Sequence, residues 1–149
     1  MSDGNLPLTE PFGMRQMQTV MAGRDRPPMV DTLDFDLVEV EKGRVVFEGT
    51  PSRRVYNPLG TVHGGYAATL LDSATGCAVH TLLNEGQGYT TLELKVAYHK
   101  AMTEQTGPVR AEGKVVTMGR RAAFAEARLT DASGRLYATA TSTLLVFDK

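Results

Sequence analysis

The residues best suited to chemistry in this chain lie between Asn57 and Asp72. Asn57, His63 and the pair Gly64–Gly65 precede a long run of apolar, small and hydroxyl residues in which Asp72 carries the only formal charge. A helix that is apolar on nearly every face is buried, and a carboxylate inside it is costly unless it has a partner or a task. Aspartate can act as a general base or a nucleophile, and glycine N–H groups at a helix start suit an anion or a developing oxyanion.

Other kinds of catalytic centre find little support in the sequence. His63, His80 and His99 are scattered along the chain without a cysteine or carboxylate set around them, so no metal site is expected. The chain has neither the Gly-x-Ser-x-Gly motif of serine hydrolases nor a phosphate-binding Gly-x-x-x-x-Gly-Lys loop. One carboxylate, one histidine, one asparagine and a helix start remain as candidates. We expect His80, near the helix end, to be structural, and His99 with Lys100 to be a surface feature.

Helix geometry limits how these groups can cooperate. Asp72 follows Gly64 by eight residues, which places it about 12 Å further along the same helix. The carboxylate of Asp72 therefore cannot reach a group held at the start of its own helix. If Asp72 and Gly64 act together, they come from two copies of the chain whose central helices run antiparallel across a two-fold axis. On that condition, the sequence predicts a homodimer.

The length of 149 residues fits one main domain. We expect residues 1–30 to form an N-terminal extension with a frayed start over residues 1–10. A short amphipathic helix from Pro11 to about Ala22 follows, and Pro27–Pro28 ends it. Residues 31–149 are expected to hold the main domain.

Alternating apolar and polar residues predict six strands in the main domain. The first two, separated by Lys42–Gly43, are typical of a hairpin, and the last four have short connections that predict an antiparallel meander. The apolar face of such a sheet needs a cover, and the only long apolar element is the helix from Gly64 to Leu83. The predicted fold is α+β, with a sheet of about six strands wrapped around one long central helix. The expected strands span Thr32–Glu41, Arg44–Thr50, Thr91–Tyr98, Val109–Met118, Ala122–Leu129 and Leu136–Phe147.

The composition argues against several partners and locations. The net charge is −1, from 16 basic and 17 acidic residues without a long run of either, so nucleic acid is not an expected partner. Asp72 and His80 make the apolar run a poor membrane span. Residues 1–4 lack the basic and apolar regions of an export signal, and the single cysteine, Cys77, has no partner for an intrachain disulfide. We expect a cytoplasmic protein.

Two features of the chain occur together in a known family. The first is the signature from Asn57 to Gly65, Asn-Pro-Leu-Gly-Thr-Val-His-Gly-Gly. The second is Leu71–Asp72 inside the long apolar helix, with four strands after it. In both, the chain resembles the hotdog-fold acyl-CoA thioesterases, specifically the phenylacetate-degradation, PaaI-like branch. The resemblance covers roughly residues 33–147.

This resemblance implies hydrolysis of an acyl-CoA to a free acid and CoA, with no cofactor besides the CoA of the substrate. It implies that the N–H of Gly64 polarises the thioester carbonyl, and that Asp72 from the partner subunit acts as general base or nucleophile. Asn57 and His63 would position the water, the thioester or the loop itself, and Thr91 would assist the water.

The resemblance also implies contacts with the rest of the substrate. Gly65 and Tyr66 would contact the acyl-CoA, and the basic turn at Arg120–Arg121 would lie near the CoA nucleotide, whose phosphates need cations. Members of the family work as dimers or as dimers of dimers, so a homodimer is the expected functional unit and a homotetramer the expected assembly.

Several alternatives remain open at this point. Asp72 could be a structural carboxylate bonded to Ser73, Thr69 or a partner chain. A non-catalytic hotdog module that senses acyl-CoA is the main rival, although residues 1–30 are too short and too neutral for the DNA-binding domain that such sensors usually carry. A hydratase or dehydratase on this fold would need a His/Asp or His/Glu pairing that the sequence does not offer. The acyl group, which could be aryl, medium-chain or varied, is not determined.

Overall fold

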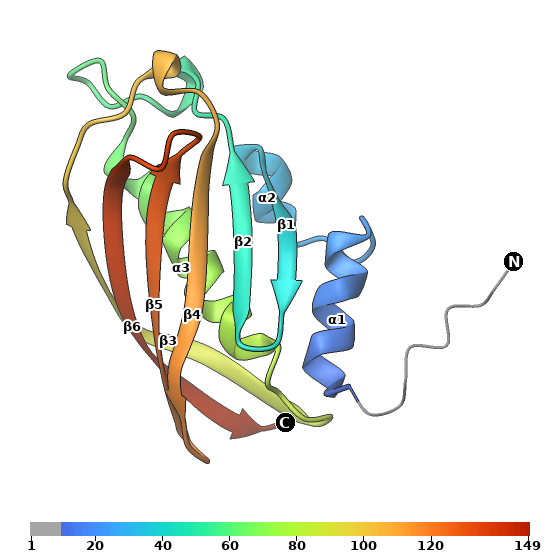
Figure 1. Cartoon of the computed structure of the whole chain (residues 1–149). Coiled ribbons are helices and arrows are strands. Elements are labelled where there is room, and N and C mark those ends of the chain that lie inside the picture. Colours follow the sequence, from blue (N-terminus) through green and yellow to red (C-terminus); the bar gives the residue numbers. More distant parts are fainter. Residues whose placement is uncertain (1–9) are drawn as a thin grey trace, which may run out of the picture.

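The computed structural model of the protein describes residues 10–149 (Figure 1). The frayed start predicted for residues 1–10 lies outside the described residues, except for residue 10. In chain order the elements are α1 (Phe12–Met21), α2 (Pro28–Leu33), β1 (Phe35–Glu41), β2 (Arg44–Gly49), α3 (Gly64–His80), β3 (Gln87–Tyr98), β4 (Val109–Met118), β5 (Ala122–Asp131) and β6 (Leu136–Asp148).

The six strands form one antiparallel sheet in the order β1-β2-β4-β5-β6-β3, and α3 packs against its inner face. Figure 1 shows the sheet curving in front of α3, with α1 and α2 beside the β1 edge. The helix contributes a fully buried set of apolar side chains to the core: Leu70, Leu71, Ala74, Ala78 and Val79. This arrangement confirms the predicted α+β hotdog fold.

The position of β3 in the sheet differs from the prediction. The β1–β2 hairpin and the β4-β5-β6 meander are confirmed, but β3 pairs with β6 instead of β4. The connection from β3 to β4, residues 99–108, contains a 3₁₀ turn at Glu104–Thr106 and is longer than a hairpin loop. It therefore allows β3 to lie at the far side of the meander. As a result, β1 and β3 form the two edges of the sheet.

Two element boundaries also differ from those expected. A strand was expected from Thr32, but this residue lies in α2, because Pro28 suits the first position of a helix. Asp34 then ends α2 in the left-handed conformation, at φ 57°, and β1 begins after it. The central helix α3 ends at His80, before the predicted Leu83. Within residues 10–149, no helix is both long and apolar enough to cross a membrane.

One contact sets how closely α3 approaches the sheet. Gly113 of β4 lies directly beneath α3, and a Cβ added there would overlap the backbone carbonyl of Ala74. Backbone atoms of a buried helix cannot move aside as a flexible side chain can. Glycine is therefore required at this position by close packing of the helix on the strand.

We expect Gly113→Ala to lower the free energy of unfolding by about 1–3 kcal/mol, because the added methyl pushes α3 away from β4. Urea unfolding followed by circular dichroism measures this change. Gly119→Ala is the matched control, since the nearest atom to its added Cβ is 3.7 Å away. Equal stability of the two variants would contradict the packing argument.

Candidate active site

Asn57 organises the loop that leads into α3. Its Oδ1 accepts hydrogen bonds from the N–H groups of Leu59 (2.9 Å) and Thr61 (3.2 Å), and its Nδ2 donates to the Thr61 hydroxyl (2.9 Å). The backbone N–H of Asn57 also donates to the Thr61 carbonyl at 2.8 Å. All of these bonds join Asn57 to residues of its own loop, so they support the loop-stabilising role among those considered for Asn57.

His63 is the N-cap of α3. Its Nδ1 accepts from the N–H of Gly65 at 2.7 Å, which satisfies one of the free donors at the helix start and requires Nδ1 to carry no proton. The neutral ring then carries its proton on Nε2. The backbone N–H of His63 donates to the Val55 carbonyl at 2.7 Å, so the cap is held from both sides.

The N–H of Gly64 differs from its neighbours. The N–H of Gly65 is bonded to His63, and the N–H of Tyr66 donates to the His63 carbonyl at 3.0 Å. Among the described residues, none accepts the N–H of Gly64. The first residue of α3 therefore presents one unused backbone donor at the positive end of the helix dipole.

Asp72 lies on the side of α3 that faces β3, and its side chain is half-buried. Its Oδ1 accepts a hydrogen bond from the Thr91 hydroxyl at 2.9 Å, and no described residue donates to Oδ2. Neither Ser73 nor Thr69 bonds this carboxylate; the Thr69 hydroxyl donates to the Gly65 carbonyl instead. The structure thus brings the two predicted residues, Asp72 and Thr91, together and leaves one carboxylate oxygen for another donor.

Strand β3 contacts both candidate functional parts of α3, the Asp72 carboxylate and the Gly64 backbone. Thr91 near its middle bonds Asp72, and Tyr98 at its end donates its hydroxyl to the Gly64 carbonyl at 2.6 Å. The strand therefore runs antiparallel to the helix along its length. Asp72 and Gly64 remain eight residues apart on one rigid helix, about 12 Å, as its rise requires.

A cavity of about 390 Å³ opens at the start of α3. Its wall contains three of the predicted residues, and also His99 and Lys100, which were expected to be a surface feature unrelated to the site. The alternation of residues along β3 could not predict that His99 and Lys100 line the cavity, because the chain leaves the strand after Tyr98 and turns toward the helix start. The lining residues are Asn57, Val62, His63, Gly64, Ala67, Tyr98, His99, Lys100, Ala101 and Met102.

The structure does not bring Tyr66 into this cavity. Tyr66 is 3% exposed, and its hydroxyl lies in a separate space of about 70 Å³ near Asp34 without a hydrogen-bond partner among the described residues. Burial, and secondarily the charge of Asp34, raises the pKa of Tyr66 to about 12. Gly65, next to it, is exposed, but its N–H is already used by His63.

The turn at Arg120–Arg121 lies away from the Gly64 cavity. It borders another cavity of about 660 Å³ together with Gln87 and Phe147. The carbonyl of Arg121 accepts from the N–H of Val146, which pairs with a β3 residue two positions before Thr91. The arginines therefore lie toward the Asp72 end of β3, at the opposite end from Gly64.

The other titratable groups along α3 do not form a reactive centre. Burial raises the pKa of the Cys77 thiol to about 12, which makes it a poor nucleophile. His80 Nε2 lies 2.8 Å from Gln16 Oε1, and burial lowers the pKa of its ring, so it is structural as expected. Within residues 10–149, no three His, Cys, Asp or Glu side chains are grouped to hold a metal ion.

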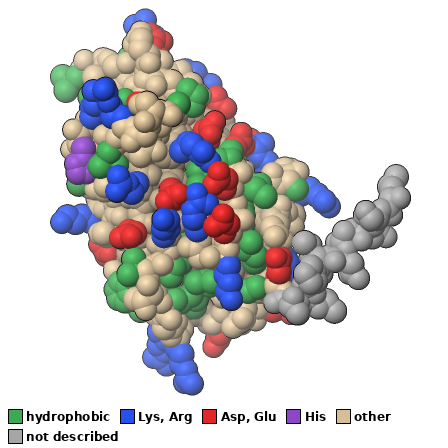
Figure 2. Space-filling view, in the orientation of Figure 1, with side chains coloured by type: hydrophobic (Ala, Val, Ile, Leu, Met, Phe, Trp, Pro, Cys, Tyr) green, Lys and Arg blue, Asp and Glu red, His purple; other side chains and the backbone are tan. Residues whose placement is uncertain are grey.

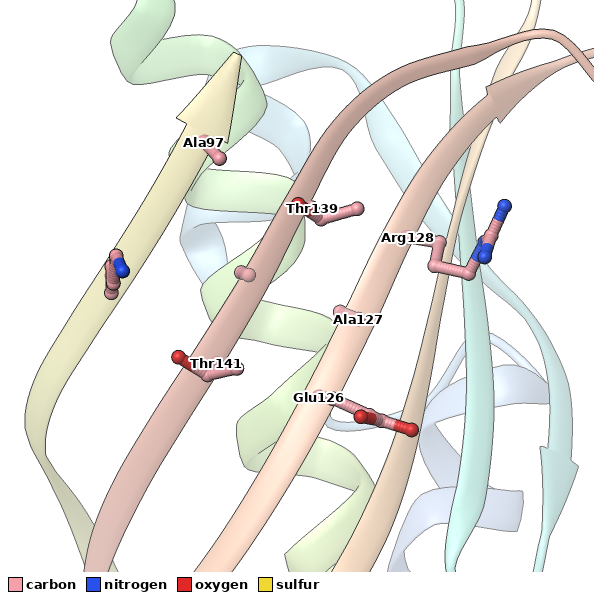
Figure 3. A pocket seen from close by; sticks show the side chains of 8 residues that line it. Ala97, Glu126, Ala127, Arg128, Thr139 and Thr141 are labelled. Carbon is pink, nitrogen blue, oxygen red and sulfur yellow. The ribbon is translucent and has the colours of Figure 1, made fainter. Parts of the chain in front are cut away.

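A shallow cavity of about 310 Å³ lies on the outer face of the sheet, over β3, β6 and β5 (Figure 3). Figure 3 shows its floor of short side chains, with Ala97 and Thr139 beside the longer Glu126 and Arg128. The α3 helix lies on the other side of these strands, so this cavity is separate from both Gly64 and Asp72. Figure 2 shows mixed acidic and basic side chains across the same face. On β2 and β4, Arg44 and Glu112 form an ion pair at 2.7 Å.

Comparison with known proteins gives consistent results. Residues 59–138 match the family model of the thioesterase superfamily. The 1,4-dihydroxy-2-naphthoyl-CoA hydrolase of Listeria monocytogenes is 27% identical over 80% of this chain and 95% of its own. A thioesterase family protein from Silicibacter pomeroyi has a similar structure, with a TM-score of 0.79 and 29% identity over 89% of this chain and 98% of its own. A phenylacetic acid degradation-related protein from Ralstonia eutropha has a TM-score of 0.78 and 25% identity over 87% and 98%.

The His63 cap can be tested separately from any activity. We expect His63→Ala to lower the free energy of unfolding by about 1 kcal/mol, because the Gly65 N–H loses its acceptor. His63→Asp supplies another capping side chain and is expected to retain most of the stability. Chemical denaturation of the three proteins measures the difference. If the alanine variant is as stable as the parent, His63 does not cap α3.

Proposed function

This chain belongs to the thioesterase superfamily, and we propose that it hydrolyses acyl-CoA thioesters to a free carboxylic acid and CoA as a member of the PaaI-like branch. The observation that carries the proposal is the unused N–H of Gly64 at the start of α3, together with the half-buried Asp72 carboxylate held by Thr91. One group can stabilise an oxyanion and the other can activate water. A thioester is already an activated acyl group, so these two groups are sufficient chemistry.

In the proposed reaction the thioester oxygen accepts the N–H of Gly64, and the helix dipole adds to the stabilisation of its developing negative charge. Water attacks the carbonyl carbon while Asp72 takes its proton, and the carbon–sulfur bond then breaks to release the CoA thiolate, which is reprotonated. Direct attack by Asp72 through an acyl-enzyme anhydride is the other route. Thr91 fixes Oδ1, so Oδ2 is the oxygen available for either route.

The helix rise requires a second copy of the chain to complete this site. β3 is an edge strand of the sheet, and exposed strand edges are templates for pairing with another chain. Leu92 and Tyr98 on this strand are 59% and 55% exposed. We therefore place the homodimer contact along β3, which sets the two α3 helices antiparallel and brings Asp72 of one copy toward Gly64 of the other.

The charges of β3 select one register for this pairing. Thr91 marks the position of Asp72 and Tyr98 that of Gly64, so the two strands must be centred near residues 94 and 95. Directly opposed residues of antiparallel strands point to the same face, and Leu94 points inward while Glu93 and Lys95 are exposed. Placing Leu94 opposite Leu94 of the second copy pairs Glu93 with its Lys95, twice. The neighbouring registers oppose two glutamates or two lysines, which is unfavourable.

The remaining contacts follow from the positions of exposed groups. Arg120 and Arg121, at the Asp72 end of the sheet, are available to bind CoA phosphates.

Phe124 and Leu145 on the outer face are 44% and 37% exposed, and Figure 2 shows apolar side chains gathered over the lower part of that face. This surface suits a dimer of dimers, in agreement with a homotetramer. Two of the similar proteins have names that refer to aromatic acids, so aryl-CoA thioesters belong in the first substrate panel.

Replacing Asp72 tests the proposed chemistry. We expect Asp72→Asn to lower kcat by about 10²–10⁴-fold, because the amide cannot accept a proton but preserves the shape and the Thr91 contact. Thiol release from a panel of aryl- and fatty-acyl-CoA thioesters, followed with a thiol reagent, measures it. Ser73→Ala, the next residue on α3, is the matched control and should retain activity. Undiminished turnover by the asparagine variant would refute the proposal, and acyl-CoA binding without thiol release by the parent protein would favour a sensor.

Charge exchange tests the proposed register. Glu93→Lys or Lys95→Glu alone places like charges opposite each other at two symmetric positions, and we expect each to weaken the dimer by about 3–30-fold in dissociation constant. The double variant restores opposite charges and should restore the affinity. Sedimentation velocity over a range of protein concentrations measures the assembly. A double variant no tighter than the singles would show that this register is wrong.

A further inference from the structure

Tyr98, the last residue of β3, contacts the start of α3 although the proposed reaction gives it no role. Tyr98 is large and 55% exposed, yet its hydroxyl donates to the Gly64 carbonyl at 2.6 Å. Its ring also covers Gly64, because a Cβ added to this glycine would lie 3.0 Å from the Tyr98 oxygen and 3.1 Å from Cζ. The tyrosine therefore contacts the helix start by both its hydroxyl and its ring.

This contact completes a clamp on a single peptide unit. The peptide that joins Gly64 to Gly65 has its carbonyl held by Tyr98 and its N–H held by His63 Nδ1 at 2.7 Å. Both residues of the unit are glycines, whose backbones adopt many conformations at little cost unless other groups restrict them. The two side chains supply that restriction from opposite sides of the peptide.

Holding this peptide fixes the direction of the neighbouring one. The N–H of Gly64 belongs to the preceding peptide and shares the Cα of Gly64 with the clamped unit. The preceding peptide is itself held at its other end, because its carbonyl, that of His63, accepts a hydrogen bond from the Tyr66 N–H at 3.0 Å. With both flanking units held, the free Gly64 N–H has a defined direction before substrate arrives, which is what an efficient oxyanion donor requires.

We propose that Tyr98 is a positioning residue that aims the Gly64 N–H at the thioester oxygen by clamping the Gly64–Gly65 peptide together with His63. This inference rests on the proposed thioesterase function. It assigns β3 two tasks, because the same strand that orients Asp72 through Thr91 orients the oxyanion donor through Tyr98. In the proposed dimer, the two groups that one strand orients serve two different active sites.

The expected kinetic signature separates aiming from substrate binding. The carbonyl oxygen of the bound substrate carries little charge and the oxyanion carries much more, so a poorly aimed donor weakens the transition state more than the ground state. Loss of the Tyr98 hydroxyl should thus lower kcat and leave KM nearly unchanged.

Tyr98→Phe tests this by removing the hydroxyl and keeping the ring. We expect kcat to fall about 3–20-fold, as for the loss of one supporting hydrogen bond, with KM changed less than about two-fold. Tyr137→Phe is the control, because it removes a tyrosine hydroxyl that bonds Asp131 at 3.0 Å outside the Gly64 cavity. Its kcat should match that of the parent protein.

A second measurement keeps the test independent of turnover and folding. A CoA thioether that carries a trifluoromethyl ketone, whose electron-poor carbonyl is largely hydrated in water and so mimics the tetrahedral oxyanion, should bind Tyr98→Phe more weakly by about the factor lost in kcat. A thioether analogue without a carbonyl should bind both proteins equally. Thermal unfolding of each variant establishes that the fraction folded is the same.

The outcomes distinguish this inference from the proposed function. A parent-like kcat in Tyr98→Phe, with Asp72→Asn inactive, would overturn the role of Tyr98 and leave the thioesterase reaction standing. A change in KM alone would show that Tyr98 contacts substrate instead of aiming Gly64. Full activity of Asp72→Asn would overturn the proposed reaction itself, whatever Tyr98 does.

Discussion

The rise of an α-helix is the constraint on which the proposed site depends. Gly64 and Asp72 belong to one buried helix, and eight residues of helix separate them by about 12 Å. The backbone of α3 at Ala74 lies directly against Gly113 of β4, so the helix is held closely on the sheet along this stretch. An oxyanion donor and a carboxylate base that must act on the same carbonyl carbon can then meet only across two copies of the chain.

Strand β3 is the element that makes this arrangement workable. It lies at the edge of the sheet, antiparallel to α3, and its two inward hydroxyls bond the Asp72 carboxylate and the Gly64 carbonyl. A strand at an edge can also pair with its own copy, and its charges favour one register over the neighbouring ones. The edge of the sheet, the orientation of the proposed catalytic groups and the proposed assembly thus depend on the same stretch of backbone.

The sequence predicted the features that depend on neighbouring residues, such as helix starts and strands. It did not predict the features that depend on packing between distant parts of the chain. The helix start at Gly64, the isolated Asp72 and most strands follow from residue types and alternation. The pairing of β3 with β6 could not be derived, since a long connection leaves strand order free. The separation of Tyr66 from the cavity could not be derived either, because it depends on how the end of α2 packs beside the start of α3. The placement of Lys100 in the cavity wall depends on where the chain goes after β3 ends.

Mixing two inactive variants tests the shared site most directly. Gly64→Pro removes the donor N–H at the first helical position, which suits proline, and His63 before it already has an extended ψ of 134°. The added ring carbons meet the Tyr98 side chain, which belongs to the same site, so this variant disables the oxyanion donor and its support together. Asp72→Asn removes the base. If the site joins Asp72 of one copy to Gly64 of the other, refolding the two variants together in equal amounts should restore about a quarter of parental thiol release, because random pairing leaves that share of sites with both groups intact. A mixture as inactive as each variant alone would contradict the account.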